Sequence, residues 1–141
     1  MAKRYWLMKT EPEAYSWDDL VAEGEGLWDG VRNHRAKNNL QAMKVGEQAF
    51  FYHSVTGKEI VGIMEVSVAG LQDPSDTTGT WASVKVKPVK KLARPVTLAE
   101  VKGDPALTDM ELVKYSRLSV AEISPDEWKH VLSLSKKPAG T

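Results

Sequence analysis

The sequence contains no cysteine and no apolar stretch long enough to span a membrane. Without cysteine, disulfide bonds and thiolate metal ligands are excluded, which fits a reducing compartment. The first four residues are followed by no run typical of a secretory signal. We therefore expect a cytoplasmic protein that does not bind membranes.

The chain also has no net charge, because 19 Lys and Arg residues balance 19 Asp and Glu residues. A surface that is positive all over is therefore excluded. The charges are nevertheless segregated: every charged residue from Glu11 to Asp29 is acidic, and every one from Arg32 to Lys37 is basic. Basic residues also dominate residues 85–94. Such segregation predicts a local basic face on a neutral protein.

Motifs of common catalytic sites are missing. There is no glycine-rich phosphate loop and no Gly-x-Ser-x-Gly turn, and the three histidines lack the short paired spacing of a metal site. His53 and Ser54 are adjacent, so on a strand their side chains point to opposite faces and cannot form a nucleophile and its base. These absences predict a protein without metal or cofactor, and they favour binding over catalysis.

Hydrophobic alternation and turn residues predict short strands with helices inserted between them. The expected fold is α+β, with a strongly bent, mostly antiparallel sheet or a small barrel and peripheral helices. The expected strands are Tyr5–Lys9, Gln48–Val55, Lys58–Ala69, Trp81–Leu92 and Leu118–Ile123. The expected helices are Ser16–Glu23, His34–Met43 and Pro125–Leu132, and a polar loop covers residues 70–80.

Three pairs of residues have the spacing of a capping box. In this motif a Ser or Thr side chain accepts a hydrogen bond from the backbone three residues later, and the acidic side chain there bonds back. The pairs are Thr97 with Glu100, Thr108 with Glu111, and Ser124 with Glu127. Each pair predicts the first turn of a helix.

The stretch from Leu27 to Lys37 combines a large ring, a turn glycine and a cluster of donors. Trp28 ends a short apolar run, Gly30 breaks it, and the segment that follows is basic. This combination suits a pocket that stacks a flat polar ligand and holds a phosphate beside it. The phosphate contacts expected here are Arg32, Arg35 and Lys37. The alternative is a core tryptophan that precedes the start of a solvated helix.

Ordered motifs along the chain resemble the EVE domain family of the PUA-like superfamily. They are Trp6–Pro12, Trp28–Asn33 with Ala36, Phe50–Ser54, Gly62, Trp81 and Arg117–Val120. The resemblance covers nearly the whole chain and implies a PUA-like fold. We expect one such domain over residues 1–134 and a flexible tail at residues 135–141.

The resemblance also implies a pocket that reads a modified base, as in the related YTH domains, which bind methylated adenine. Trp28 matches an aromatic wall of that pocket, while Asp29 and Asn33 match the positions where polar groups meet the base. We expect the Trp28 ring to be only partly covered by protein. The implied pocket residues are Lys9, Thr10, Glu11, Trp28, Asp29, Asn33, Tyr52, His53 and Ser54.

Two departures from the family pattern bear on this pocket. His34 stands where the family often has tyrosine, and the loop at residues 70–80 is shorter than usual. Two functions remain open: a non-enzymatic reader of a modified base in DNA or RNA, and an enzyme acting on modified nucleotides or nucleosides with Glu11 or Asp29 as base. The missing nucleophile–base pair favours the reader. A pocket that serves only protein contacts is a third possibility.

Overall fold

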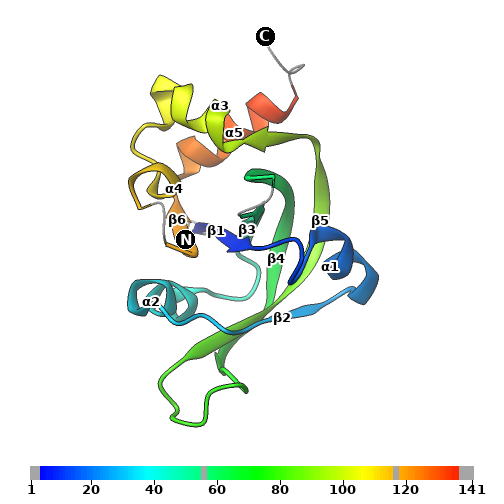
Figure 1. The fold of residues 1–141 in the computed structure, drawn as a ribbon, viewed down its shortest axis with the longest axis vertical. Coiled ribbons are helices and arrows are strands. Elements are labelled where there is room, and N and C mark those ends of the chain that lie inside the picture. Colours follow the sequence, from blue (N-terminus) through cyan, green and yellow to red (C-terminus); the bar gives the residue numbers. More distant parts are fainter. Residues whose placement is uncertain (1–3, 55–56, 116–117, 137–141) are drawn as a thin grey trace.

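The computed structural model describes residues 4–54, 57–115 and 118–136 of the chain. Its centre is a bent, six-stranded sheet with the strand order β2-β5-β4-β3-β1-β6 (Figure 1). The strands are β1 (Tyr5–Thr10), β2 (Gly26–Trp28), β3 (Gln48–His53), β4 (Glu59–Gln72), β5 (Ala82–Thr97) and β6 (Val120–Ile123). Within the described ranges β2 and β6 remain edges, so the sheet is open and does not close into a barrel.

Helices cover both faces of this sheet. They are α1 (Trp17–Glu23), α2 (His34–Ala42), α3 (Leu98–Gly103), α4 (Glu111–Lys114) and α5 (Pro125–Ser135), with one 3₁₀ turn, η1 (Pro105–Leu107). In Figure 1, α3 and α5 gather at one end of the molecule, away from α1 and α2, and α4 lies between that end and α2. The long β4–β5 hairpin extends beyond the rest of the chain at the other end.

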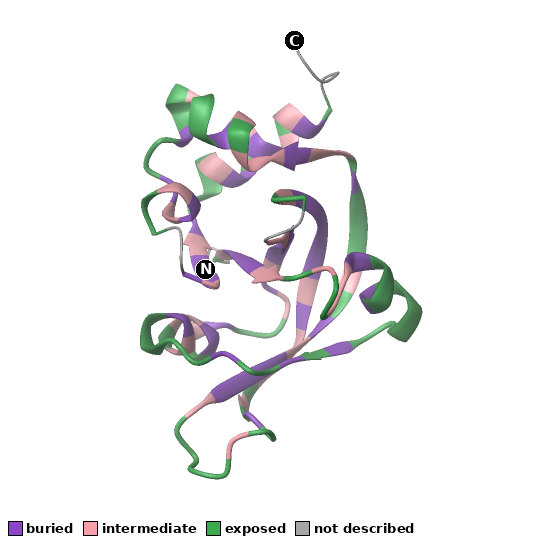
Figure 2. Cartoon of the chain, in the orientation of Figure 1, coloured by how far each residue is buried: buried purple, intermediate pink, exposed green. Residues whose placement is uncertain are grey.

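Alternation along the strands divides the apolar side chains between two clusters. On β1, Trp6 and Met8 join α1 and α2, while Leu7 joins the cluster formed with α3, α4 and α5. On β3, Phe51 belongs to the first cluster and Phe50 to the second. Successive side chains of a strand point to opposite faces, so one sheet supports two layers of helices. Figure 2 shows the buried residues following the strands.

Most strand pairs are antiparallel, and this part of the expectation is confirmed. The exception is β1, which lies parallel to β3 and antiparallel to β6. β3 and β4 form an antiparallel pair. The turn between them includes residues 55 and 56, which lie outside the described residues, as does the expected end of the strand at Val55.

Strands β4 and β5 are longer than expected. We expected β5 to end at Leu92, before Pro95, but it continues to Thr97. Proline is tolerated because the register shifts between Ile60 and Gly62 of β4, whose partners on β5 are Val96 and Lys91. Pro95 therefore lies at an irregularity of the strand pairing, where the ladder does not require a hydrogen bond from its backbone nitrogen. The loop expected at residues 70–80 begins only after Gln72.

Capping boxes begin three of the helices. Ser16 with Asp19 starts α1, Thr97 with Glu100 starts α3, and Ser124 with Glu127 starts α5. The box expected for Thr108 and Glu111 is wrong. Helix α4 begins after Met110 with no side-chain cap, and the Thr108 hydroxyl donates to the Pro105 carbonyl instead.

Helix α1 packs its Trp17 side chain against Gly62 of β4. Trp17 and Leu20 are its buried residues, while Val21 is 52% exposed. A Cβ on Gly62 would lie 2.6 Å from the Trp17 ring, so only glycine admits the ring. At the other end of the chain α5 runs through Ser135, and residues 137–141 of the expected tail lie outside the described residues.

Candidate functional site

A cavity of about 490 Å³ opens where β1 ends, between the loop that follows it and the segment that follows β2. This volume lies within the range of small-molecule pockets. The lining residues are Lys9, Thr10, Ala14, Tyr15, Leu27, Trp28, Asp29, Gly30, Val31, Arg32, Asn33 and Ser119. The cavity therefore brings together the stretch around Trp28 and the end of β1, as the sequence indicated.

Trp28 lines this cavity but is more enclosed than expected. It is 6% exposed, so the prediction of a ring only partly covered by protein is wrong. Tyr15 and Phe51 both meet it nearly perpendicularly, at centroid distances of 6.3 and 5.4 Å. These neighbours cover the indole within the apolar cluster. Trp28 therefore belongs both to the apolar core and to the wall of the cavity.

The side-chain oxygen of Asn33 caps the start of α2. Its Oδ1 accepts a hydrogen bond from the Ala36 backbone N–H at 3.0 Å, which makes Asn33 the N-cap of the helix. Nδ2 makes no hydrogen bond to any residue that the structure describes, so the Asn33 amide can offer the cavity a donor. Asp29, which is exposed, supplies an acceptor on the same rim.

The wall formed by residues 30–32 is held by a buried carboxylate from the β4–β5 loop. Oδ2 of Asp73 accepts hydrogen bonds from the Gly30 N–H at 2.8 Å and from Arg32 at 2.9 Å. Burial opposes ionisation of Asp73, but hydrogen bonds from Ser75, Arg32 and the Gly30 backbone outweigh it, and together they hold the pKa of Asp73 well below its usual range. The short loop thus supplies a structural anchor for the pocket.

The three predicted phosphate-binding residues take different positions. Arg32 lines the cavity, whereas Arg35 and Lys37 do not. Arg35 donates to Glu111 of α4 at 2.7 Å and lies over the Tyr115 ring. Lys37 is directed at Trp81 of the hairpin, with its ammonium 5.9 Å from the ring centroid. Only Arg32 therefore sits beside the pocket, although all three cations remain on one helix start.

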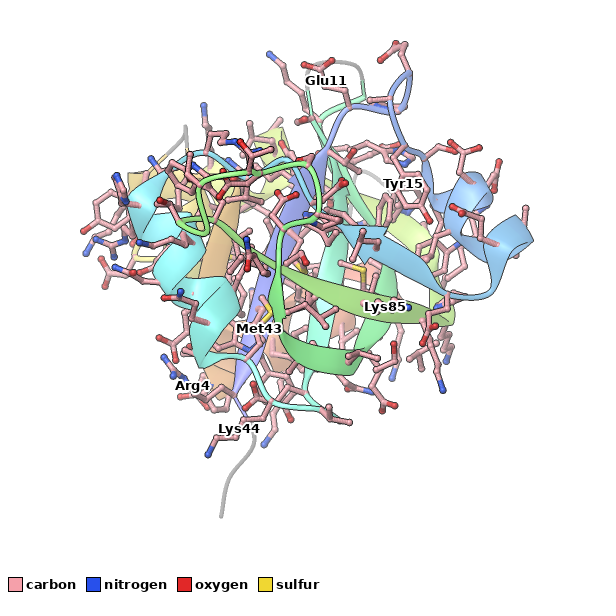
Figure 3. The ribbon with its side chains drawn as sticks, turned by 90° about the horizontal axis from the view of Figure 1, so that it is seen from below. Arg4, Glu11, Tyr15, Met43, Lys44 and Lys85 are labelled. Atoms are coloured by element: carbon pink, nitrogen blue, oxygen red, sulfur yellow. The ribbon has the colours of Figure 1, made fainter. Side chains whose placement is uncertain are left out.

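Four other predicted pocket residues do not line the cavity. Tyr52 is buried on the opposite side of the sheet, in the cluster with α5, because it alternates with Phe51. Its phenol lies near the Lys9 ammonium, 5.7 Å from the ring centroid, and burial, with Glu59 nearby, raises the pKa of Tyr52 to about 12. Glu11 is exposed and stands at the outer edge of the molecule in Figure 3, whereas Tyr15 lies nearer to β2.

His53 and Ser54, which follow Tyr52, make hydrogen bonds that stabilise the fold. His53 Nε2 accepts a hydrogen bond from the Trp17 backbone N–H at 3.1 Å, which requires the neutral imidazole. Burial lowers the pKa of His53, despite the nearby carboxylate of Glu59. The Ser54 N–H donates to the Thr10 carbonyl at 2.8 Å and so extends the pairing of β1 and β3.

Four contributors to the site were not among the predicted site residues. Tyr15 follows a proline-containing loop, and its hydroxyl lies over Gly26, where a Cβ would stand 2.2 Å away. Ser119 reaches the cavity because its carbonyl accepts a hydrogen bond from the Lys9 N–H. Ala14 and Asp73 carry no local signal, since each acts through residues distant in the sequence.

Within the described ranges, no group of three or more His, Asp or Glu side chains is arranged to hold a metal ion. Across the same residues, no helix combines the length and the apolar character needed to cross a membrane.

The bent, open sheet with its two helical layers places the protein among the PUA-type folds. A YTH domain from Zygosaccharomyces rouxii, solved with N6-methyladenosine RNA, has a TM-score of 0.61 and 22% identity, covering 96% of this chain and 88% of that one. At this identity the likeness concerns the fold alone.

The family is identified by the sequence. A family model described as EVE domain matches residues 4–134, and the chain belongs to the EVE domain family. Human thymocyte nuclear protein 1 is 36% identical over 168 residues, which cover 94% of this chain and 74% of that protein. The resemblance stated from the motifs is thereby confirmed.

Two solved structures show how closely the fold is shared. A Rhodopseudomonas palustris protein solved by NMR has a TM-score of 0.89 and 47% identity, covering 98% of both chains. Human THYN1, solved in complex with 5-methylcytosine-containing DNA, has a TM-score of 0.88 and 35% identity, covering 96% of this chain and 99% of that one.

Proposed function

We propose that this protein binds nucleic acid and holds one modified base in the cavity lined by Trp28. The observation that carries the proposal is the cavity itself: an apolar wall, a rim of donors and acceptors, and the Arg32 cation stand together around one opening. A base turned out of its stack needs these three elements. The complex of a relative with 5-methylcytosine DNA supports the same function.

The rim matches the groups of a methylated cytosine. Asp29 offers an acceptor to the exocyclic amino group, the pairing that carboxylates make with cytosine. The Asn33 amide offers a donor to the ring carbonyl. Leu27 and Val31 give the methyl group an apolar surface. We propose 5-methylcytosine as the first base to test, in DNA and in RNA.

We further propose that binding is not followed by a reaction. Among the described residues no histidine lines the cavity, and Glu11, one of the two carboxylates considered as a base, does not line it either. The other carboxylate, Asp29, lines the cavity but is exposed to solvent. Any product formed on incubation with modified nucleotides or nucleosides would overturn this part.

A substitution that fills the cavity without touching the core tests the function. Ala14 is exposed and lines the opening, so Ala14→Trp should block base entry and leave folding intact. The matched control is Ala99→Trp, because Ala99 is also exposed and lines a separate cavity of about 290 Å³ beside α3.

The measurement is the affinity of both variants for oligonucleotides with and without 5-methylcytosine. We expect Ala14→Trp to lose the preference for the methylated strand, and Ala99→Trp to keep it. Equal affinity of the unsubstituted protein for both strands would overturn the choice of base. A preference that survives Ala14→Trp would place the reading site elsewhere.

A further inference from the structure

A second cavity, of about 240 Å³, lies where α2 meets the β4–β5 hairpin. Trp81 forms its aromatic wall and is only half-buried. Gln41 of α2 and Gln72 of β4 stand on its rim, and both are exposed. An aromatic wall with amide groups beside it accepts a planar polar ring in the same way as the first cavity does.

Arg32 connects the two cavities. It lines the first, and its guanidinium carbon lies 5.5 Å from the centroid of Trp81, which lines the second. Two further groups of the α2 start approach the same ring: His34 stacks on it at 4.9 Å, and the Lys37 ammonium lies 5.9 Å away. The positive charges of Arg32 and Lys37 are therefore both close to the Trp81 wall of the second cavity.

Arg32 can still donate hydrogen bonds to a ligand, although it already bonds to Asp73 and Ser75. A guanidinium has five N–H donors. Within the described residues three are used, to the Val31 carbonyl, Asp73 and Ser75. The side chain is 41% exposed, so the remaining donors are accessible. Asp73 and Ser75 hold the group in place, which reduces the entropy that an anion must overcome on binding.

We propose that the second cavity is a subsite for the nucleotide next to the modified base, and that Arg32 binds the phosphate that joins the two. This inference rests on the proposed function. It implies that the ligand is a nucleic-acid strand of at least two nucleotides, and that a free modified nucleoside fills only half of the site. The neighbouring base packs against Trp81, within reach of the Gln41 and Gln72 amides.

The test compares a modified nucleoside with two ligands that are each one nucleotide longer. The probes are 5-methyldeoxycytidine and the two dinucleotides that carry it, one with the neighbour on the 5′ side and one with it on the 3′ side. We expect one dinucleotide to bind roughly ten- to a hundredfold more tightly than the nucleoside, the effect of stacking one more base on an aromatic ring. Trp81→Ala should remove this gain and leave nucleoside affinity unchanged.

Three variants keep the result interpretable. Trp81→Phe retains an aromatic wall and should restore part of the gain. Gln41→Ala changes an exposed helix residue, so it should reduce the gain without affecting the melting temperature. Tyr115→Ala is the matched control, because Tyr115 is another exposed aromatic beneath an arginine but lines neither cavity. It should leave the gain intact.

The outcomes separate the subsite from the proposed function. If the nucleoside binds as tightly as either dinucleotide, the second subsite is overturned and base reading stands. If Trp81→Ala weakens the nucleoside and the dinucleotide equally, Trp81 acts through the first cavity, which also overturns the subsite. If nothing binds, including long methylated strands, the proposed function fails and the subsite fails with it.

Discussion

At the scale of single residues, Asp73 has the largest structural role near the site. It is fully buried on the hairpin loop, yet its hydrogen bonds reach Gly30 and Arg32, which are 43 and 41 residues away in the sequence. Without it, the Gly30 N–H and one guanidinium donor would lose their partner. The shape of the cavity wall therefore depends on one carboxylate outside the cavity.

We expect Asp73→Asn to lower the free energy of unfolding by about 1–3 kcal/mol at neutral pH, because the donors that surround this buried position lose a charged acceptor. The pKa of Asp73 is depressed in the folded protein. Its contribution is therefore present above the unfolded-state pKa of about 3.9, and it is lost as pH falls through the folded-state value. Denaturant unfolding should show the difference between the two proteins at pH 7 and a smaller difference below about pH 4.

Asp76→Asn is the control for this prediction. Asp76 lies on the same loop and accepts hydrogen bonds from Thr78, Thr80 and Trp81, but it bonds to no residue that lines the first cavity. It should leave the affinity for 5-methyldeoxycytidine unchanged, whereas Asp73→Asn should weaken it. Equal affinities for the two variants would mean that the anchor does not shape the pocket.

Trp28→Ala should cost about 3–5 kcal/mol of stability, as expected when a buried aromatic side chain is truncated. The reason is its packing against Tyr15 and Phe51 with 6% exposure. Loss of nucleic-acid binding by this variant would therefore report unfolding as well as stacking. Melting temperatures of Trp28→Ala and Ala14→Trp separate the two, and an unchanged melting temperature for Trp28→Ala would contradict the core assignment.

At the scale of elements, the helix caps offer a matched comparison. Ser124 accepts a hydrogen bond from the Glu127 N–H at 3.1 Å, so Ser124→Ala should cost about 1 kcal/mol. Thr108 has the same sequence spacing to an acidic residue but caps no helix, so Thr108→Ala should be close to neutral. Denaturation midpoints give both values. A comparable loss at Thr108 would mean that the capping box forms after all.

This contrast shows which features a sequence can predict. Ser124 and Glu127 are three residues apart, and the strand alternation of β1 and β3 repeats every second residue, so local chemistry decides them. Glu111 had the right spacing, but its carboxylate accepts from the Glu122 N–H and pairs with Arg35. Those partners are distant in the sequence, and no local pattern indicates them.

The residues of the site also divide into those that neighbouring residues predict and those whose position depends on distant parts of the chain. Trp28, Asp29, Arg32 and Asn33 are neighbours in the chain, and the sequence predicted that they would share a pocket. Tyr52, His53 and Ser54 were assigned by resemblance alone, and where they lie depends on strand register and on the position of α1. The cytoplasmic location and the single-domain boundaries stay predictions.

At the scale of the whole molecule, zero net charge requires that any attraction to nucleic acid come from local charge. The cations at the start of α2 are not equivalent, because Arg35 pairs with Glu111 while Lys37 lies over an aromatic ring. Binding to a methylated strand should weaken as salt rises, with each phosphate contact adding roughly 0.7–0.9 to the slope of log affinity against log salt.

We expect Lys37→Gln to flatten that slope by about one contact and Arg35→Gln to change it less, because Glu111 already neutralises Arg35. Neither should alter the preference for the methylated base. The measurement is a salt titration of affinity for methylated and unmethylated strands. A slope untouched by Lys37→Gln would move the phosphate path away from α2.

The position of β1 between β3 and the edge strand β6 also constrains how the molecule folds. Tyr5 of β1 lies opposite both Gln48 and Ile123. During synthesis β1 emerges before β6 and keeps an unpaired edge until residues 120–123 leave the ribosome, and such non-local pairing slows folding and favours misassociation. Since Ser119 and Lys9 meet at the cavity, the pocket is assembled only when β6 has joined β1.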